Sequence, residues 1–168
     1  MLDAERMTTI RTARSDDLDG VVAVGHRTWP DAYTKLAGAE YVARGLATWW
    51  SAEPTLASIN AGRVAVAEVD GEIVGMTGVG PGDGCLILWK LYVVPEMQSQ
   101  GIGSALLDQL VHDACSTNER AIRLEHLDGN KRAESFYTAK GFRETNREPD
   151  PDGGPDRVWM ELPLDGRC

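Results

Sequence analysis

The chain has 168 residues, 26 of them acidic and 17 basic, which gives a formal net charge of −9 at pH 7. This acidic balance argues against nucleic-acid binding, which depends on basic patches, and no apolar run approaches the roughly 20 residues of a membrane span. The length fits a single domain over residues 1–168 with a core of its own. Because Met1–Arg6 lacks the features of a secretory signal, we expect a cytoplasmic protein with residues 1–7 as a flexible tail.

The first third of the chain predicts one strand followed by two helices. Residues 8–13 have the composition of a strand, and Ser15 is expected to cap a helix because two aspartates follow it in the first turn. Apolar positions continue this helix as far as Pro30, where the missing amide hydrogen is expected to end it. A second helix is predicted over roughly residues 39–50.

The middle of the chain predicts three consecutive strands. Residues 63–69 alternate valine with smaller side chains, and Asp70-Gly71 is a strong hairpin turn that leads to a return strand over residues 72–79. A glycine-rich turn then precedes residues 85–94. That segment is apolar almost throughout, which is typical of a central strand covered on both faces.

A short polar turn with two glycines follows this apolar strand. The turn spans Gln98–Gly103, and a helix is predicted at once because apolar residues recur every four positions from Ile102 to about Ser116. Glycine lets the backbone approach a ligand closely, and the unpaired amides at a helix start attract anions. The sequence therefore predicts an anion site suited to a pyrophosphate. Taken alone, the pattern is equally typical of an ordinary tight turn.

The last third predicts another strand, a short helix and a closing hairpin. Residues 121–126 form the strand, Asn130 is expected to cap the helix, and Gly141 to end it. Two further strands are predicted over residues 142–146 and 158–162, joined by a loop rich in proline, aspartate and glycine.

The cysteines and histidines give no sign of a metal site. Cys85, Cys115 and Cys168 are scattered, no pair has metal-ligand spacing, and the three histidines form no cluster. We therefore expect reduced thiols and no metal.

Two of these blocks together resemble the GNAT superfamily of acetyl-CoA-dependent N-acetyltransferases. The family's acetyl-CoA motif, Gln/Arg-x-x-Gly-x-Gly/Ala, is matched by Gln98, Gly101 and Gly103. Its second motif is matched by Asn130, Ala133, Phe136-Tyr137 and Gly141-Phe142. The resemblance, clear from Arg63 to Leu162, implies an α/β (α+β) fold with a mixed, mostly antiparallel sheet of about seven strands. In the family this sheet is splayed between the fourth and fifth strands and flanked by about four helices.

The resemblance also implies that acetyl-CoA, as co-substrate, lies in the splay. The residues expected to bind it are Leu91, Tyr92, Val93 and Val94 at the fourth strand, Gln98, Ser99, Gln100, Gly101, Ile102, Gly103 and Ser104 in the turn, and Asn130, Ala133, Phe136 and Tyr137 on the later helix. Lys131, Arg132 or Lys140 could add positive charge for this polyanion, although each is also typical of a solvated surface.

Direct acetylation of an amine needs a base for the amine and an acid for the departing thiolate. The resemblance assigns the acid to Tyr137, whose alternative role is a core aromatic. Many family members place a glutamate on the fourth strand, but Leu86–Leu91 contains no carboxylate. Glu125 stands five residues before Asn130, as in ribosomal-protein N-terminal acetyltransferases, and is the leading candidate for the base. A surface glutamate without a role, and deprotonation by water, remain alternatives.

The implied activity is acetyl transfer to a primary amine within a ternary complex. In this fold the acceptor is usually walled by segments corresponding to Trp29–Tyr33 and Arg147–Arg157. Side chains there that could hold a cation are Trp29, Asp31, Tyr33, Glu148 and Asp150.

Several alternatives stay open at this point. Residues 146–162 also resemble the end of the ribosomal-protein enzymes, but the tyrosines that those enzymes carry at Arg147 and Glu148 are absent. A small amine is therefore expected first and a protein N-terminus second.

A non-catalytic CoA sensor is the alternative of another class. A nucleotide hydrolase is disfavoured because the turn lacks the lysine of a P-loop. No nucleic-acid or membrane partner is expected, and a homodimer is left open.

Overall fold

The computed structural model describes residues 6–168, which form seven strands and five α-helices. The strands are β1 (Thr8–Thr12), β2 (Val64–Val69), β3 (Glu72–Pro81), β4 (Leu86–Val93), β5 (Ala121–Leu127), β6 (Arg143–Glu148) and β7 (Arg157–Pro163). The helices are α1 (Leu18–Ala37), α2 (Ala39–Trp49), α3 (Ala52–Asn60), α4 (Ile102–Ser116) and α5 (Lys131–Ala139), with short 3-10 turns η1 (Ser15–Asp17) and η2 (Pro95–Met97). Most of the tail expected at residues 1–7 lies outside the described residues.

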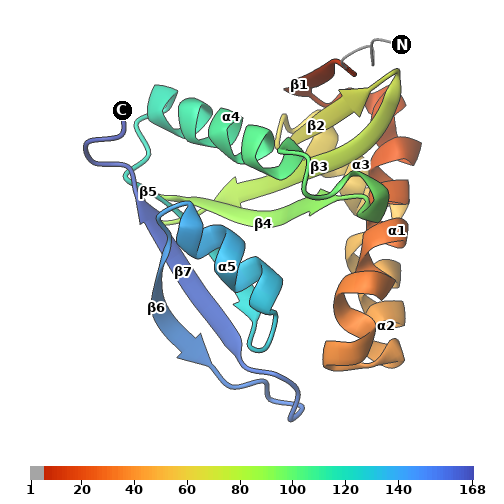
Figure 1. Cartoon of the computed structure of the whole chain (residues 1–168), viewed down its shortest axis with the longest axis vertical. Helices are drawn as coiled ribbons and strands as arrows, with labels where there is room; N and C mark the ends of the chain where they lie inside the picture. The colour runs from red at the N-terminus through yellow and green to blue at the C-terminus, as the bar shows by residue number, and fades with distance from the viewer. Residues whose placement is uncertain (1–5) are drawn as a thin grey trace.

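All seven strands belong to one sheet, in the order β1-β2-β3-β4-β5-β7-β6 (Figure 1). Every neighbouring pair is antiparallel except β4 and β5, which are parallel. This confirms the mixed, mostly antiparallel sheet predicted from the sequence. Helices α4 and α5 lie on one face, and α1, α2 and α3 lie on the other. Among the helices of residues 6–168, none is long and apolar enough to cross a membrane.

The sheet opens between β4 and β5, as expected. The two strands pair only at Leu86–Leu88, opposite Ile122–Leu124. Beyond that point β4 stays with β3 and β5 stays with β7, so the two halves of the sheet diverge (Figure 1). A β-bulge at Trp89 marks the start of the opening, because Lys90 pairs with Gly78 whereas Leu88 pairs with Val79.

The expectation that β4 is covered on both faces is wrong at this bulge. The side chain of Trp89 remains 51% exposed. It lies where β5 has left the strand, and its ring meets that of Trp159 edge-on at a centroid distance of 6.1 Å. The divergence of the strands therefore leaves space beside β4 that a continuous sheet would fill.

The prediction that Pro30 ends the first helix is also wrong. Helix α1 continues to Ala37 with Pro30 inside it. Proline cannot donate to the carbonyl of His26 one turn earlier, but Pro30 and His26 are both exposed, so water can reach that carbonyl. The opposite face of the helix buries Val24 and Trp29, and this packing holds the two halves of the helix together.

Two further details of the first third differ from the sequence prediction. Ser15 does not cap α1; it opens η1, and the carboxylate of Asp17 accepts a hydrogen bond from the backbone N–H of Arg14 at 2.7 Å. Helix α3 was not predicted at all, because Pro54 and several small residues give its nine positions a weak apolar period.

Asp17 connects the start of α1 to the edge of the sheet. Its carboxylate accepts hydrogen bonds from the guanidinium of Arg11 on β1 at 2.7 and 2.9 Å, and the same guanidinium donates to Glu68 on β2 at 2.7 Å. The bonds from Arg11 lower the pKa of Asp17 to about 2. The ionised carboxylate is therefore part of the folded structure.

Asp17→Asn is expected to lower the free energy of unfolding at pH 7 by about 1–2 kcal/mol, because it removes a charge-assisted pair. A carboxyl whose pKa is lowered by folding contributes its full stabilisation at pH values above its ordinary pKa of 3.8. This contribution is lost as the pH falls from 3.8 through about 2. The free energy of unfolding measured with urea should therefore be lower for the variant than for the wild type at pH 7. The difference should be much smaller near pH 2. Exposed Asp16→Asn is the control, and an equal loss for both variants would contradict the prediction.

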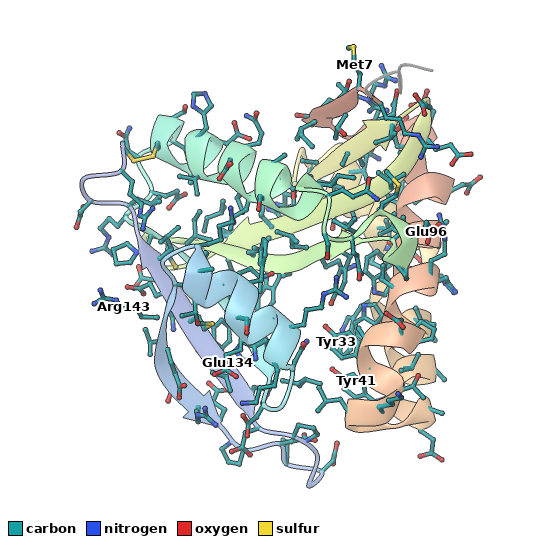
Figure 2. The ribbon with its side chains drawn as sticks, in the orientation of Figure 1. Met7, Tyr33, Tyr41, Glu96, Glu134 and Arg143 are labelled. Carbon is teal, nitrogen blue, oxygen red and sulfur yellow. A yellow bond between two sulfur atoms is a disulfide. The ribbon has the colours of Figure 1, made fainter. Side chains whose placement is uncertain are left out.

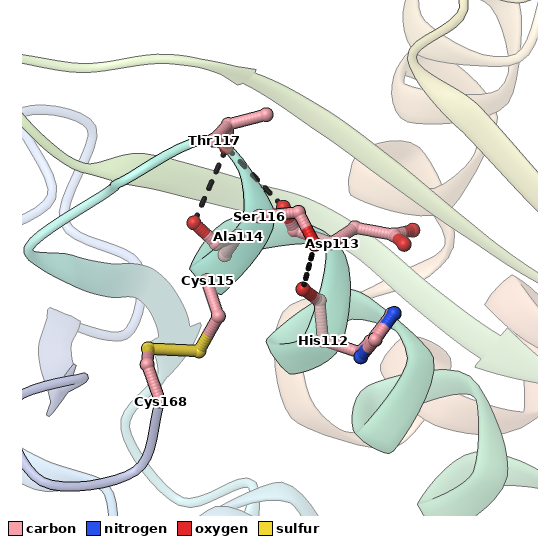
Figure 3. The surroundings of a disulfide bond; sticks show 7 residues. All are labelled: His112, Asp113, Ala114, Cys115, Ser116, Thr117 and Cys168. Carbon is pink, nitrogen blue, oxygen red and sulfur yellow. Dashed lines mark hydrogen bonds between the residues drawn. A yellow bond between two sulfur atoms is a disulfide. The ribbon is translucent and has the colours of Figure 1, made fainter.

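The expectation of three reduced thiols is wrong for two of them. Cys115, in the last turn of α4, forms a disulfide with Cys168, with a Cα–Cα distance of 5.5 Å (Figure 3). The chain after β7 turns back toward the end of α4, since Leu164 is buried and its N–H donates to the carbonyl of Arg120 at 2.9 Å. Fifty-three residues separate the two cysteines in sequence, so no local spacing could reveal the pair. Cys85 is free and buried.

Candidate active site

A cavity of about 660 Å³ lies along the opening between β4 and β5, on the face covered by α4 and α5. It brings together most of the residues that the sequence singled out for coenzyme binding. Those that line it are Leu91, Tyr92, Val93, Gln98, Ser99, Gly101, Gly103, Ser104, Asn130, Ala133, Phe136 and Tyr137. Glu125 and Arg132 line it as well.

Three other residues expected to bind the coenzyme do not line this cavity. Val94 is fully buried, and its N–H donates to the carbonyl of Val74 at 2.8 Å. The side chain of Gln100 donates to the carbonyl of Glu96 at 3.3 Å, and the side chain of Ile102 is buried in the core. The side chains of Val94 and Ile102 are therefore out of reach of a ligand, whereas that of Gln100 is exposed outside this cavity.

The backbone of β4 has a free edge inside the sheet. From Leu91 to Val93 the strand pairs with β3 on one side, while β5 has already diverged on the other. In such a strand, alternate N–H and C=O groups point away from the paired neighbour, so they face the cavity. An extended chain containing amides can hydrogen-bond there as an added strand would. The side chain of Gln98 donates to the carbonyl of Val93 at 2.9 Å and so holds the turn against this strand.

The turn before α4 presents backbone amides to the same cavity. Ser99 and Gly101 both have positive φ, 62° and 84°, and Gly101 is the N-cap residue of the helix. No side chain among residues 6–168 caps α4, so within the described chain the first amides of this 15-residue helix are not used by a side-chain acceptor. Unpaired amides of this kind, together with the helix dipole, favour an anion.

The basic residues near this site have different surroundings. Arg132 lines the cavity. Lys131 pairs with Glu134 at 3.1 Å, and Lys140 lies over the ring of Phe136 at 5.9 Å. Arg132 is therefore the best placed of the three to contact an anion.

Helix α5 positions Tyr137 on the wall of the cavity. The predicted cap is confirmed, since Asn130 Oδ1 accepts from the N–H of Ala133 at 3.2 Å. Tyr137 packs edge-on against Phe136 and Phe142, with ring centroids 5.2 and 5.4 Å away. Burial, with a smaller contribution from Tyr33, raises the pKa of Tyr137 above its ordinary value. Its phenol therefore stays protonated, as a proton donor requires.

Glu125 lies on β5 just beyond the last residue that pairs with β4. It lines the cavity described above and also a second one on the opposite face. Burial raises the pKa of Glu125, opposed by the positive charge of Arg157 and reinforced by Glu148. A carboxylate with a raised pKa is a stronger base near neutral pH than an exposed one.

The second cavity, of about 500 Å³, lies beneath α1, α2 and α3. Its walls are strongly aromatic, with rings from Trp29, Tyr33, Tyr41, Trp49, Trp89 and Tyr92. The charged side chains that line it are Lys90, Glu125 and Arg157. Figure 2 shows Tyr33 and Tyr41 extending from α1 and α2 toward the opening of the sheet.

The two cavities meet at the opening between β4 and β5. Tyr33, Trp89, Tyr92, Glu125 and His126 line both of them. The hydroxyls of Tyr33 and Tyr92 are hydrogen-bonded at 2.9 Å, so helix α1 is tied to β4 at this junction. A molecule in one cavity can therefore approach a molecule in the other through the sheet.

The residues expected to wall an acceptor are divided among several places. Trp29 and Tyr33 line the second cavity, whereas Asp31 lines the first. Glu148 lies 3.6 Å from Arg157, and Asp150 accepts from the N–H of Gly154 at 2.9 Å within its own loop. The two carboxylates thus already have local partners.

Sequence reasoning missed Lys90, which lines the second cavity from β4. Its signal was a single charged residue inside the apolar run of the fourth strand. It also missed the contributions of Tyr41 and Tyr92 to this cavity, because aromatic residues on separate elements give no local pattern.

Comparison with known proteins agrees with this arrangement. The model of the acetyltransferase (GNAT) domain family matches residues 60–144, just over half of the chain. An uncharacterized N-acetyltransferase from Archaeoglobus fulgidus is 29% identical over 148 residues, which cover 80% of this chain and 92% of that protein. The ribosomal protein bS18-alanine N-acetyltransferase of Escherichia coli K12 is 33% identical over 81 residues, but the match spans only 46% of this chain and 55% of that enzyme.

Solved structures share the whole fold. The PaiA N-acetyltransferase of Thermoplasma acidophilum, in complex with coenzyme A, superposes with a TM-score of 0.83 at 22% identity, covering 94% of this chain and 99% of that one. The ribosomal-protein-S18-alanine N-acetyltransferase of Escherichia coli gives a TM-score of 0.72 at 25% identity, with 94% of each chain covered. With its family match, fold and paired cavities, the chain belongs to the GNAT family and is an N-acetyltransferase.

Proposed function

We propose that this enzyme transfers the acetyl group of acetyl-CoA to a primary amine by direct attack within a ternary complex. The observation that carries the proposal is the junction of two cavities through the sheet at Glu125, Tyr33 and Tyr92. The coenzyme would occupy the cavity beside α4 and α5, and the amine the cavity beneath α1, α2 and α3. The amine nitrogen and the thioester carbon could then meet at the opening between β4 and β5.

The residues at the junction suit the proton transfers of this reaction. Glu125 would accept a proton from the ammonium form of the acceptor, directly or through water. As the new C–N bond forms, N–H groups on the free edge of β4 would stabilise the oxyanion. Tyr137 would then protonate the sulfur as the C–S bond breaks, and the amine's second proton would return to solvent. Before the next turnover Glu125 would release its proton to solvent and Tyr137 would take one up, so that one proton is released overall.

A protein N-terminus is the second candidate acceptor. It is supported by the spacing of Glu125 and Asn130 and by the partial match to the Escherichia coli ribosomal-protein enzyme. A CoA-binding sensor without catalysis is the alternative of another class, and the absence of a carboxylate from Leu86–Leu91 on β4 favours it.

A panel assay separates these possibilities. Release of the CoA thiol from acetyl-CoA should be measured with small amines, with peptides bearing a free N-terminal alanine, and with no acceptor. Acceleration by small amines supports the proposal, and acceleration by peptides alone supports the second candidate. Tight binding of acetyl-CoA without acceleration by any acceptor would support the sensor.

Glu125→Gln is expected to lower kcat/KM by about tenfold at pH 7, below the usual range for a general base because water can take over part of the role. In the wild type, kcat/KM should fall as Glu125 becomes protonated at acid pH, since its pKa is raised. The variant should not show this fall of kcat/KM at acid pH. Glu72→Gln, exposed at the start of β3, is the matched control. Superimposable profiles for Glu125→Gln and the wild type would rule out a role as base.

A further inference from the structure

The second cavity has an electrostatic character opposite to that of the chain as a whole. The chain carries a net charge of −9, yet this cavity is lined by two cations, Lys90 and Arg157, and one carboxylate, Glu125. A site built for a polycationic amine would need several carboxylates far from the reacting nitrogen. The charges here indicate a different acceptor.

The two cations of the second cavity, Lys90 and Arg157, differ in whether a carboxylate pairs with them. Arg157 lies 3.6 Å from Glu148, whereas no carboxylate among residues 6–168 forms a salt bridge with Lys90. The ammonium of Lys90 is held over the ring of Trp50, 4.1 Å from its centroid, and donates to the backbone carbonyl of Trp49. These contacts position the charge but leave it unneutralised.

An unpaired ammonium in such surroundings is costly to retain. Burial lowers the pKa of Lys90 to about 8, so the group is still mainly protonated at pH 7. A methionine or leucine would fill the same space beside Trp50 without a desolvation penalty. A charge kept in a cavity under these conditions is a candidate for ligand recognition.

The remaining walls favour an apolar skeleton. Trp29 stacks on Tyr41 with 5.8 Å between ring centroids, and Trp49 lies 5.6 Å from Trp29. Packed rings of this kind make a firm surface for a flat or branched hydrocarbon group. The volume of about 500 Å³ lies within the range of small-molecule sites.

We infer that the acceptor is a primary amine on an aromatic or branched apolar skeleton that also carries one anionic group, with the amine directed to Glu125 and the anion to Lys90. This rests on the proposed function and specifies its substrate class as an amino acid or a similar aminocarboxylate. It assigns substrate selection to Lys90. Polyamines, which carry no anion, are expected to be poor acceptors.

The inference can be tested with amines of matched skeleton. Phenylalanine and 4-(2-aminoethyl)benzoate each carry a carboxylate, phenethylamine carries none, and spermidine is a polycation. At saturating acetyl-CoA, we expect kcat/KM to be about tenfold higher for at least one carboxylate-bearing amine than for phenethylamine, and lowest for spermidine. Lys90→Met should remove this tenfold advantage, because it should raise KM for the carboxylate-bearing amine about tenfold more than KM for phenethylamine.

Controls separate recognition from folding. Lys35→Met, exposed on α1 and lining neither cavity, should keep the advantage. Lys90→Arg should retain part of it because the positive charge stays. Calorimetric binding of coenzyme A and the midpoint of thermal unfolding show whether each variant is folded. Equal losses for all amines in Lys90→Met, or fastest turnover of spermidine, would overturn the inference.

Failure of the proposed function would look different. No amine would then accelerate thiol release, although acetyl-CoA still binds. In that case calorimetry with each amine in the presence of coenzyme A decides the inference. Tighter binding of a carboxylate-bearing amine to the wild type than to Lys90→Met supports it, and equal binding overturns it.

Discussion

Tyr137→Phe is expected to lower kcat by about 100- to 1,000-fold, within the range of about 10²- to 10⁴-fold typical for a positioned general acid. The departing thiolate has an ordinary pKa near 8.5 and the phenol one near 10, so proton transfer depends on position rather than on driving force. In the proposed ternary complex Tyr137 would have that position, because it lines the cavity that we assign to the coenzyme. Burial raises its pKa further, which keeps the proton on the phenol throughout the neutral range.

The variant distinguishes catalysis from packing because it keeps the ring. The contacts of Tyr137 with Phe136 and Phe142 are ring-to-ring, and phenylalanine preserves them. Acetyl-CoA affinity, measured by calorimetry, should therefore change by less than about threefold, or about 0.6 kcal/mol. If kcat also changes by less than threefold, Tyr137 is a core aromatic and another group protonates the sulfur. A large loss of both affinity and thermal stability would likewise argue for a packing role.

The sequence predicted the parts of the site that follow one another along the chain. Gln98, Gly101 and Gly103 lie within one turn, and Asn130, Phe136 and Tyr137 within one helix, so their spacing alone places them together. The opening between β4 and β5 was expected only through resemblance to a family. Its physical origin is the end of pairing at Leu88 and the bulge at Trp89, neither of which leaves a local pattern.

Features made by distant segments were beyond prediction. The disulfide depends on the path of the chain after β7, which brings Cys168 to the end of α4. The continuation of α1 past Pro30 depends on burial of Trp29 against other elements, which outweighs one lost hydrogen bond. The second cavity is lined by residues from three helices and five strands. The role that we infer for Lys90 therefore depends on neighbours that lie far from it in sequence.

Gly101→Ala is expected to weaken acetyl-CoA binding by about 10- to 100-fold. Gly101 has φ of +84° at the start of α4, a conformation that costs an alanine about 1–2 kcal/mol. A Cβ there would meet no heavy atom within 4 Å, so steric collision within the protein is not the cause. Relaxation of the turn would instead rotate the amides at the start of α4 away from a bound diphosphate.

Gly62→Ala is the matched control for this variant. Gly62 has φ of +71°, its Cβ would also lie in open space, and it lines neither cavity. Both variants should lose similar free energy of unfolding, but only Gly101→Ala should lose affinity for acetyl-CoA. S-acetylpantetheine, which lacks the diphosphate, should bind the wild type and Gly101→Ala equally. A comparable loss for both ligands would show that the turn supports the pantetheine arm and not an anion, because S-acetylpantetheine carries neither the diphosphate nor the 3′-phosphoadenosine of acetyl-CoA.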